Sequence, residues 1–342
     1  MVNHRRISRR QVLAGLAVLG CSSFVGASRL IRVAQATTAL KVSMLLPGQI
    51  DDGGFMEAGY RGLLRIQQEL GATVDYMDQI APEPELLANA LRELASQQPT
   101  LVIAHGGQNS EATALVAKEF PEITFVVVQG NVTDTNLASY EVLQEQSAWL
   151  GGAAAGLLTK TQVVGHISGI RVTPGLKGRA AFADGLRYTN PNAQFLTNFC
   201  GTQDDSNRAK QVALAEIDAG ADIIFTMLNA GRVGAIEACR ERGVFQIGNV
   251  RDWVSVDPEV FIASAIANVS IPGFLAAKDL AEGSFTPGTV RQIGLEVPEA
   301  VSLTLANSVD SGIQSEIETL AARIIAGEIA VSTEYSGPEF EA

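Results

Sequence analysis

The sequence predicts an α/β protein with two lobes, each a doubly wound parallel sheet with flanking helices. Three observations carry this prediction. The 342 residues give room for two hydrophobic cores. Short apolar runs, typical of buried parallel strands, alternate with longer segments whose apolar residues recur at helical spacing. The alternation then starts afresh near residue 163, which indicates a second lobe of similar build.

The first lobe begins with the apolar strand Val42–Leu46, which Pro47 and Gly48 end. A helix carrying Met56 and Leu63 on one face follows after a short loop. The further elements predicted for this lobe are strand Ala72–Met77, helix Glu83–Gln97, strand Thr100–Ala104, helix Ala112–Phe120, strand Thr124–Val128 and strand Leu137–Tyr140. Strands and helices that alternate at these lengths favour right-handed crossovers.

A helix of small residues, Glu145–Thr159, leads into the second lobe. The elements predicted there are strand Val163–Ile167, helix Gly175–Tyr188, strand Gln194–Phe199, helix Asp205–Ala219, strand Asp222–Met227, helix Ala230–Arg242, strand Val244–Ile247 and strand Val260–Ala265. Helices near Ile271–Glu282 and Ser311–Ala326 are expected to return to the first lobe. The first lobe is therefore predicted as 37–140 plus about 270–330, the second as 141–269, and 331–342 as a loose tail.

Residues 1–36 differ from the rest and predict an export signal. They hold six arginines and no acid, and Arg9 and Arg10 precede a modest apolar stretch, as in twin-arginine signals. Val18-Leu19-Gly20-Cys21 is an imperfect lipobox, in which Cys21 would be lipidated. Alternatively, signal peptidase would cut after Val25-Gly26-Ala27 or Ala34-Gln35-Ala36. The protein is thus expected in the periplasm or lipid-anchored at the outer face of the cytoplasmic membrane.

The charge of the remaining chain argues against nucleic acid as a partner. Without residues 1–36, 25 − 6 = 19 basic residues face 37 acidic ones, a net charge of −18. Such a surface repels nucleic acid and has no electrostatic hold on an anionic membrane, so only a lipid anchor would link it to one. Cys200 and Cys239 would form a disulfide or stay as two buried thiols. No cysteines and histidines stand at metal-binding spacing, so neither a metal nor a cofactor is expected.

Polar side chains follow the carboxyl ends of the predicted strands, where open α/β sheets bind ligands. The loop after the first strand carries Asp51, Asp52 and the aromatic Phe55. The residues that follow five later strands are His105, Gln108 and Asn109; Gln129 and Asn131; Gln203, Asp204 and Asp205; Asn229; and Asn249, Arg251, Asp252 and Trp253. Amide groups both donate and accept hydrogen bonds, so two such rims could bind the edge of a heterocycle. Alternatively, the amides are ordinary turn residues, Phe55 is a core residue, and Asp51 or Asp52 caps a helix.

Enzyme motifs are absent. The sequence has no phosphate-binding Gly-x-x-x-x-Gly-Lys-Ser/Thr loop and no Gly-x-Ser-x-Gly nucleophile elbow, and Gly-x-Gly-x-x-Gly does not follow the first strand. The acid pairs Asp51/Asp52 and Asp204/Asp205 have no histidine or cysteine aligned with them, so capping or contacts with ligand hydroxyls explain them better than catalysis.

The segment Ile50–Phe55 resembles the DD-x-x-F motif of the basic membrane protein family. The likeness continues through Asn136–Tyr140 with Glu145, Leu150–Ala155, Thr159–Thr161, Val164–Ile167, Gly201–Asp205, Gly220–Ile224, and Ile247–Gly248 with Asp252. The order and spacing of these segments, spread over residues 41–326, make the match specific. The family consists of exported solute-binding proteins, often lipoproteins, that serve ABC importers of purine nucleosides or bases.

This resemblance implies a periplasmic-binding-protein fold with a hinge between its lobes and a purine-like ligand in the cleft. By position, Asp52 and Phe55 match the family's loop acid and base-stacking aromatic, Asp252 matches an acid near the hinge, and Gly231 a glycine loop of the second lobe. The family's second aromatic is Gln203 here, and Trp253 would be its substitute.

The sequence and the resemblance together predict a non-enzymatic, monomeric receptor. It would bind a purine nucleoside or nucleobase and deliver it to an ABC permease and its ATPase. The predicted ligand-binding residues are Asp51, Asp52, Phe55, Gln108, Gln129, Gln203, Asn229, Gly231, Asp252 and Trp253. One alternative is a protein of the same fold that binds a sugar or another small polar solute. Another is an exported hydrolase that uses one of the acid pairs.

Overall fold

The structure is a computed structural model that describes residues 40–52 and 54–342. The predicted export signal and the lipidation of Cys21 lie outside these residues. Within them, no helix is long and apolar enough to cross a membrane.

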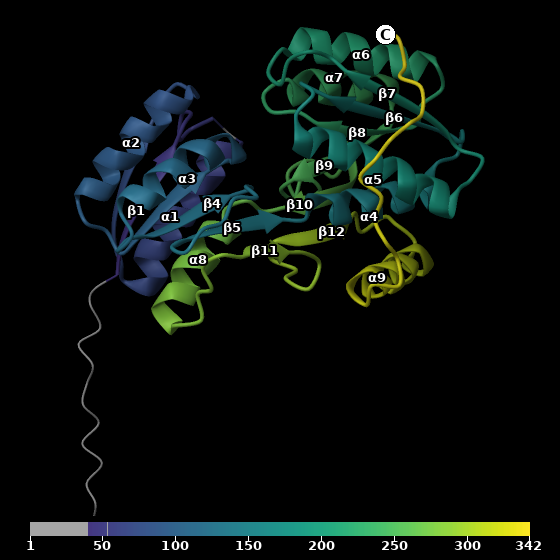
Figure 1. The fold of residues 1–342 in the computed structure, drawn as a ribbon. Coiled ribbons are helices and arrows are strands. Elements are labelled where there is room, and N and C mark those ends of the chain that lie inside the picture. The colour runs from purple at the N-terminus through teal and green to yellow at the C-terminus, as the bar shows by residue number, and fades with distance from the viewer. Residues whose placement is uncertain (1–39, 53) are drawn as a thin grey trace, which may run out of the picture. The chain divides into compact units, whose positions relative to one another are not determined.

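The first sheet has six parallel strands in the order β11-β5-β4-β3-β1-β2. Figure 1 labels β11, β5, β4 and β1 of this sheet. Its strands are β1 (Lys41–Leu46), β2 (Thr73–Asp78), β3 (Leu101–His105), β4 (Thr124–Val128), β5 (Leu137–Val142) and β11 (Val290–Ile293). Its helices are α1 (Phe55–Leu70), α2 (Pro84–Ser96), α3 (Ser110–Glu119), which follows the 3₁₀ turn η1 (Gly107–Asn109), and α8 (Ile271–Glu282). Helices α1 and α8 pack together, as do α2 and α3. Met44 and Leu46 of β1 belong to the core with α1 and α8, whereas Leu45 belongs to the core with α2 and α3, as strand alternation requires.

The second sheet has the order β12-β10-β9-β8-β6-β7, and only β12 runs antiparallel to its neighbour. Its strands are β6 (Val163–Ser168), β7 (Gln194–Phe199), β8 (Ile223–Met227), β9 (Phe245–Val250), β10 (Phe261–Ala267) and β12 (Val301–Leu305). Its helices are α4 (Gln144–Leu158), α5 (Thr173–Thr189), α6 (Ser206–Asp218), α7 (Arg232–Arg242) and α9 (Ser311–Ile325). Helices α4 and α5 pack together, as do α6 and α7. The predicted fold class, two α/β lobes built on parallel sheets, is confirmed.

The segment 270–330 is divided between the two sheets, and this corrects its assignment to the first lobe. Helix α8 and β11 join the first sheet, whereas β12 pairs with β10 and α9 packs against α4. Neither β11 nor β12 was predicted. Both are short edge strands with few buried residues, so neither shows the apolar run of an inner strand.

The carboxyl-terminal residues 331–342 are not the loose tail that their composition predicted. The main-chain N–H of Phe340 donates to the carbonyl of Thr197 at 2.8 Å, and the Asn198 amide donates to the carbonyl of Phe340 at 2.8 Å. Glu339 forms ion pairs with Arg171 and Arg179. The tail thus covers β7, an edge strand whose free backbone groups need partners.

The two cysteines of the described residues, Cys200 and Cys239, are buried free thiols. The alternative of a disulfide between them is therefore wrong for this structure.

Glu216 on α6 is a fully buried carboxyl group, and we predict that it makes the stability depend on pH. Burial raises its pKa well above 4.5, and a Cβ on Gly165 would lie 2.2 Å from its Oε2. As pH rises above about 4.5, the unfolded chain loses this proton while the folded chain keeps it, so stability falls. Glu216→Gln, which is neutral at every pH, should therefore raise the melting temperature at about pH 8 much more than at about pH 4. Glu318→Gln, on an exposed face of α9, is the control, and an equal gain for Glu216→Gln at both pH values would contradict the prediction.

Candidate functional site

A cavity of about 450 Å³ is lined by residues of both lobes. The loop after β1 and the first residue of α1 line it from the first lobe. The loops after β6, β7, β8 and β9 line it from the second. All of these segments lie at carboxyl ends of strands, the edge where the sequence places a ligand. Of the predicted residues, five line this cavity: Asp52, Phe55, Gln203, Asn229 and Trp253.

Asp52 lines the cavity and also caps α1. Its Oδ1 accepts hydrogen bonds from the main-chain N–H groups of Gly54 at 2.8 Å and Glu57 at 3.1 Å, and its Oδ2 accepts one from Met56 at 3.2 Å. The capping role considered for this residue is therefore present. A carboxylate at the positive end of a helix is stabilised as an anion, and much of its charge is offset there.

Phe55 lies between the cavity and His105. The two ring centroids are 4.3 Å apart with the planes tilted by 37°, and the carbonyl of Phe55 lies 2.9 Å from Nε2 of His105. Because a carbonyl only accepts, this nitrogen carries the proton. Burial lowers the pKa of His105 to about 4, so the ring is neutral near pH 7. Gly59 of α1 makes room for it, since a Cβ there would lie 2.6 Å from the imidazole. His105 thus packs against the ring of Phe55 on the side away from the cavity.

Gln203 and the loop after β8 are joined through their main chains. The carbonyl of Gln203 accepts hydrogen bonds from the N–H groups of Asn229 at 3.1 Å and Gly231 at 3.0 Å. A Cβ on Gly231 would lie 2.9 Å from that carbonyl oxygen, which explains a glycine at this position. Gly231 itself does not line the cavity, whereas the side chain of Asn229 reaches toward Gly54 of the first lobe. Gly231 therefore shapes the site, and Gln203 and Asn229 are among the residues that line it.

Trp253 is packed against protein groups. Its ring stacks on Phe261 with centroids 5.4 Å apart, and its Nε1 donates to the carbonyl of Asn249 at 3.0 Å. The guanidinium groups of Arg232 and Arg251 lie 4.5 Å and 4.1 Å from its centroid. These contacts make Trp253 a platform for two arginines.

Arg232 lines the cavity, but the sequence did not predict it as a site residue. It stands in the first turn of α7, where an arginine normally points to solvent, yet it is only 3% exposed. Its guanidinium donates to the carbonyls of Thr226 at 3.1 Å and Leu228 at 2.6 Å, and to Oδ1 of Asn249 at 2.6 Å. Arg232 is buried by residues at the ends of β8 and β9. No pattern in the sequence around Arg232 predicts this burial.

Val250, between Asn249 and Arg251, has an unusual backbone. Its φ of 73° lies in the left-handed region, which costs a β-branched residue roughly 1–2 kcal/mol. Its main chain turns directly before Arg251, which lines the cavity. Strain of this kind often occurs at functional sites.

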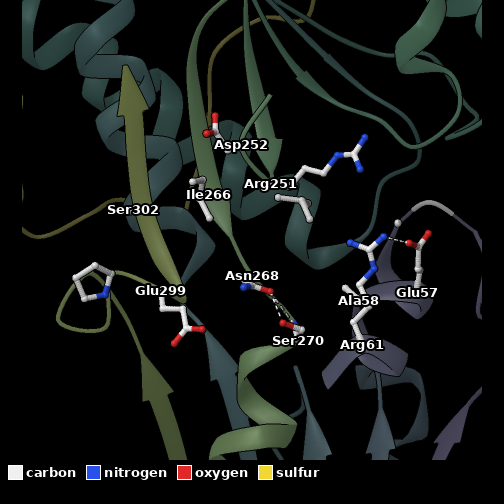
Figure 2. Close-up of a pocket in the computed structure, with 13 residues that line it drawn as sticks. Glu57, Ala58, Arg61, Arg251, Asp252, Ile266, Asn268, Ser270, Glu299 and Ser302 are labelled. Carbon is white, nitrogen blue, oxygen red and sulfur yellow. Dashed lines mark hydrogen bonds and ion pairs between the residues drawn. The ribbon is translucent and has the colours of Figure 1, made fainter. Parts of the chain in front are cut away.

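Asp252 lies in a neighbouring cavity of about 440 Å³ (Figure 2). The two cavities share Gly54, Val250 and Arg251 among their lining residues. Polar pairs line the second one, with an ion pair between Glu57 and Arg61 and a hydrogen bond from Ser270 to Asn268. The predicted acid near the hinge is therefore adjacent to the main cavity, not in its wall.

Three predicted residues lie away from both cavities. Asp51 and Gln108 are exposed and line neither of them. Gln129 lines a small pocket of about 70 Å³. Its Oε1 accepts a hydrogen bond from the N–H of Val142, so its amide joins the ends of β4 and β5. Gln108 and Gln129 fit the turn alternative that the sequence left open for the amides, and Asp51 lies in the turn before α1.

Within the part of the chain that the structure describes, no three histidine, cysteine or acidic side chains are grouped as metal ligands would be. The cavity is lined by the aromatic residues Phe55 and Trp253, by four residues with side-chain amides and by two arginines. It is thus equipped to hold a small organic molecule through stacking and hydrogen bonds.

Two α/β lobes built on parallel sheets, with a cavity lined by both, have the architecture of solute-binding proteins. Comparison with known families agrees. The chain belongs to the family described as ABC transporter substrate-binding protein PnrA-like, whose sequence model matches residues 39–334. It is therefore a substrate-binding protein of an ABC transporter, a class that implies a small-molecule ligand and a membrane transporter as partners and is typically exported.

Individual relatives have low sequence identity to this chain but align with most of its length. Basic membrane protein B of Borrelia garinii subsp. bavariensis is 25% identical over 341 residues, which cover 96% of this chain and 97% of the relative. The transcriptional activator protein med of Bacillus subtilis is 27% identical over 248 residues, covering 72% and 77%. A solved ABC transporter solute-binding protein from Conexibacter woesei superposes with a TM-score of 0.71 at 24% identity, covering 86% of this chain and 99% of that one.

Proposed function

We propose that the cavity binds a purine nucleoside or nucleobase and that the protein delivers this ligand to an ABC permease without changing it. Export by residues 1–36 belongs to the same proposal, because a receptor for an importer meets its ligand outside the membrane. A single chain is sufficient to bind the ligand, so the protein is proposed to act as a monomer.

The position of Phe55 is the observation that supports the proposal most strongly. One side of its ring is held by His105, and the residue lines the cavity. Apolar side chains of the second lobe, Val172, Met227 and Val233, line the same cavity. A flat ring between these walls would stack on Phe55, and base–aromatic stacking contributes about 1–3 kcal/mol. The amides of Gln203 and Asn229 can donate to and accept from the polar edge of a base.

Thermal-shift measurements with purine bases and nucleosides test the proposal. A ligand that binds only the folded protein must raise its melting temperature. Phe55→Ala should weaken binding by about tenfold to a hundredfold, the loss of one stack. Phe245→Ala is the matched control, because Phe245 is 39% exposed and starts β9, at the opposite end of that strand from the cavity.

The alternatives predict different results. If a sugar stabilised the protein and Phe55→Ala left that effect unchanged, the protein would be a binding protein for a polar solute. If a bound nucleoside were hydrolysed, and Asp52→Asn abolished the turnover, the receptor role would be replaced by an enzyme. The absence of any shift with purines would remove the proposed ligand.

A further inference from the structure

The cavity concentrates positive charge in a strongly acidic protein. Outside residues 1–36 the chain has a net charge of −18, yet the cavity wall holds two guanidinium groups, Arg232 and Arg251, and a single carboxylate, Asp52. Asp52 accepts three hydrogen bonds from the start of α1. In residues 40–52 and 54–342, neither arginine has a carboxylate oxygen within 4.0 Å. The positive charge of this wall is therefore not balanced by the protein.

Arg232 is a buried cation held only by neutral groups. Its hydrogen bonds go to two carbonyls, the Thr226 hydroxyl and the Asn249 amide, and the Trp253 ring lies over it. Burial, together with the charge of Arg251, lowers its pKa to about 9. Burying a charge without a counter-ion is costly, so an anion placed in this cavity would be stabilised.

Arg251 is the arginine that a ligand can reach. It is exposed, it lines both cavities, and its guanidinium lies 4.1 Å from the centroid of Trp253. Its guanidinium forms no hydrogen bond with any other residue that the structure describes, so its planar set of donors is available. Such a group can bind a carboxylate or phosphate through two parallel hydrogen bonds.

Two helix amino termini add to the positive potential. Pro174 and Gly175, the second and third residues of α5, line the cavity, and so do Arg232 and Val233 at the start of α7. Each helix of this length carries a partial positive charge at that end. Together with the two arginines, they surround the space beside Phe55 with positive charge.

We propose that the ligand carries a carboxylate or phosphate group beside its planar ring, and that Arg251 binds this anionic group against the positive wall formed by Arg232 and the helix termini. This inference rests on the proposed function, since it adds a feature to the ligand of the same cavity. A nucleoside monophosphate and a heteroaromatic carboxylate both have this chemistry.

Calorimetric titration of the mature protein with matched ligand pairs tests the inference. One pair is inosine and inosine 5′-monophosphate, and the other is purine and purine-6-carboxylate. In at least one pair the anionic member should bind about tenfold or more tightly than the neutral member, the value of one charge-assisted hydrogen bond. The pair that shows this preference tells whether phosphate or carboxylate is bound.

Arg251→Gln should reduce that preference to about twofold or less, and Arg251→Lys should give an intermediate value, because it keeps the charge and loses the paired donors. Arg242→Gln is the control. It removes the same charge at the other end of α7, where Arg242 pairs with Asp218, and it should leave the preference unchanged.

Neutral members that bind as tightly as anionic ones would overturn this inference and leave the purine proposal in place. So would a preference that survives Arg251→Gln. If succinate, which has no ring, bound in an Arg251-dependent way and no ring compound did, the positive site would stand and the purine proposal would fall. If none of these compounds bound, both proposals would be rejected.

Discussion

Gly152→Ala should destabilise the protein by about 3 kcal/mol or more, the upper range for overpacking a core. Helices α4 and α5 touch backbone to backbone at this point. A Cβ on Gly152 would lie 1.9 Å from the carbonyl oxygen of Phe182, and one on Gly185 would lie 2.0 Å from that of Trp149. No side chain can rotate away to relieve these contacts, so the helices themselves must separate.

The neighbouring Gly151 provides a matched control on the same helix. A Cβ there would meet its nearest atom, on Ile247, at 3.5 Å, an ordinary contact. Alanine is favoured over glycine in a helix interior by about 1 kcal/mol, so Gly151→Ala should leave stability unchanged or raise it. Urea unfolding of the two variants measures the difference. Equal stabilities would show that α4 and α5 are not in close contact.

The two sheets could be predicted because inner parallel strands are short apolar runs. The run Val42–Leu46 and its counterparts are buried on both faces, so local sequence identifies them. The strand Val290–Ile293 lies at a sheet edge and alternates partly buried and exposed residues, and nothing local distinguishes it from a loop. The tail 331–342 is ordered by β7 and by Arg171 and Arg179, contacts that its own composition cannot reveal.

The site could be predicted only in part. The strand-end rule placed Phe55 and Asn229 at the cavity, because all parallel strands of a sheet end at the same edge. The same rule selected Gln108 and Gln129, since polar residues also serve turns at that edge. Arg232 was missed because its burial depends on the loops around it. Tertiary packing thus determines the buried charge of the cavity, whereas the exposed Arg251 follows a strand end that the sequence indicated.

Acid should destabilise the protein through two buried histidines. Burial lowers the pKa of His105 from 6.5 to about 4, and burial together with the charge of Arg179 lowers that of His166 to about 3. Below about pH 6.5 the unfolded chain takes up these protons and the folded chain does not. The contribution of the two neutral histidines to stability is therefore complete above about pH 6.5 and is lost as pH falls, by about 1.4 kcal/mol per pH unit for each histidine.

Because Glu216 titrates with the opposite sign, the contribution of the histidines must be isolated by comparing variants. The free energy of unfolding should be measured between about pH 4.5 and about pH 7 for the wild type, His105→Gln, His166→Gln and the double variant. Each replacement should reduce the acid slope by about 1.4 kcal/mol per pH unit, whatever it does to stability at neutral pH. A double variant with the wild-type slope would contradict the assignment. Because the folded protein protonates His105 only near its pKa of about 4, any effect of this charge on ligand binding should appear near that pH and not closer to neutrality.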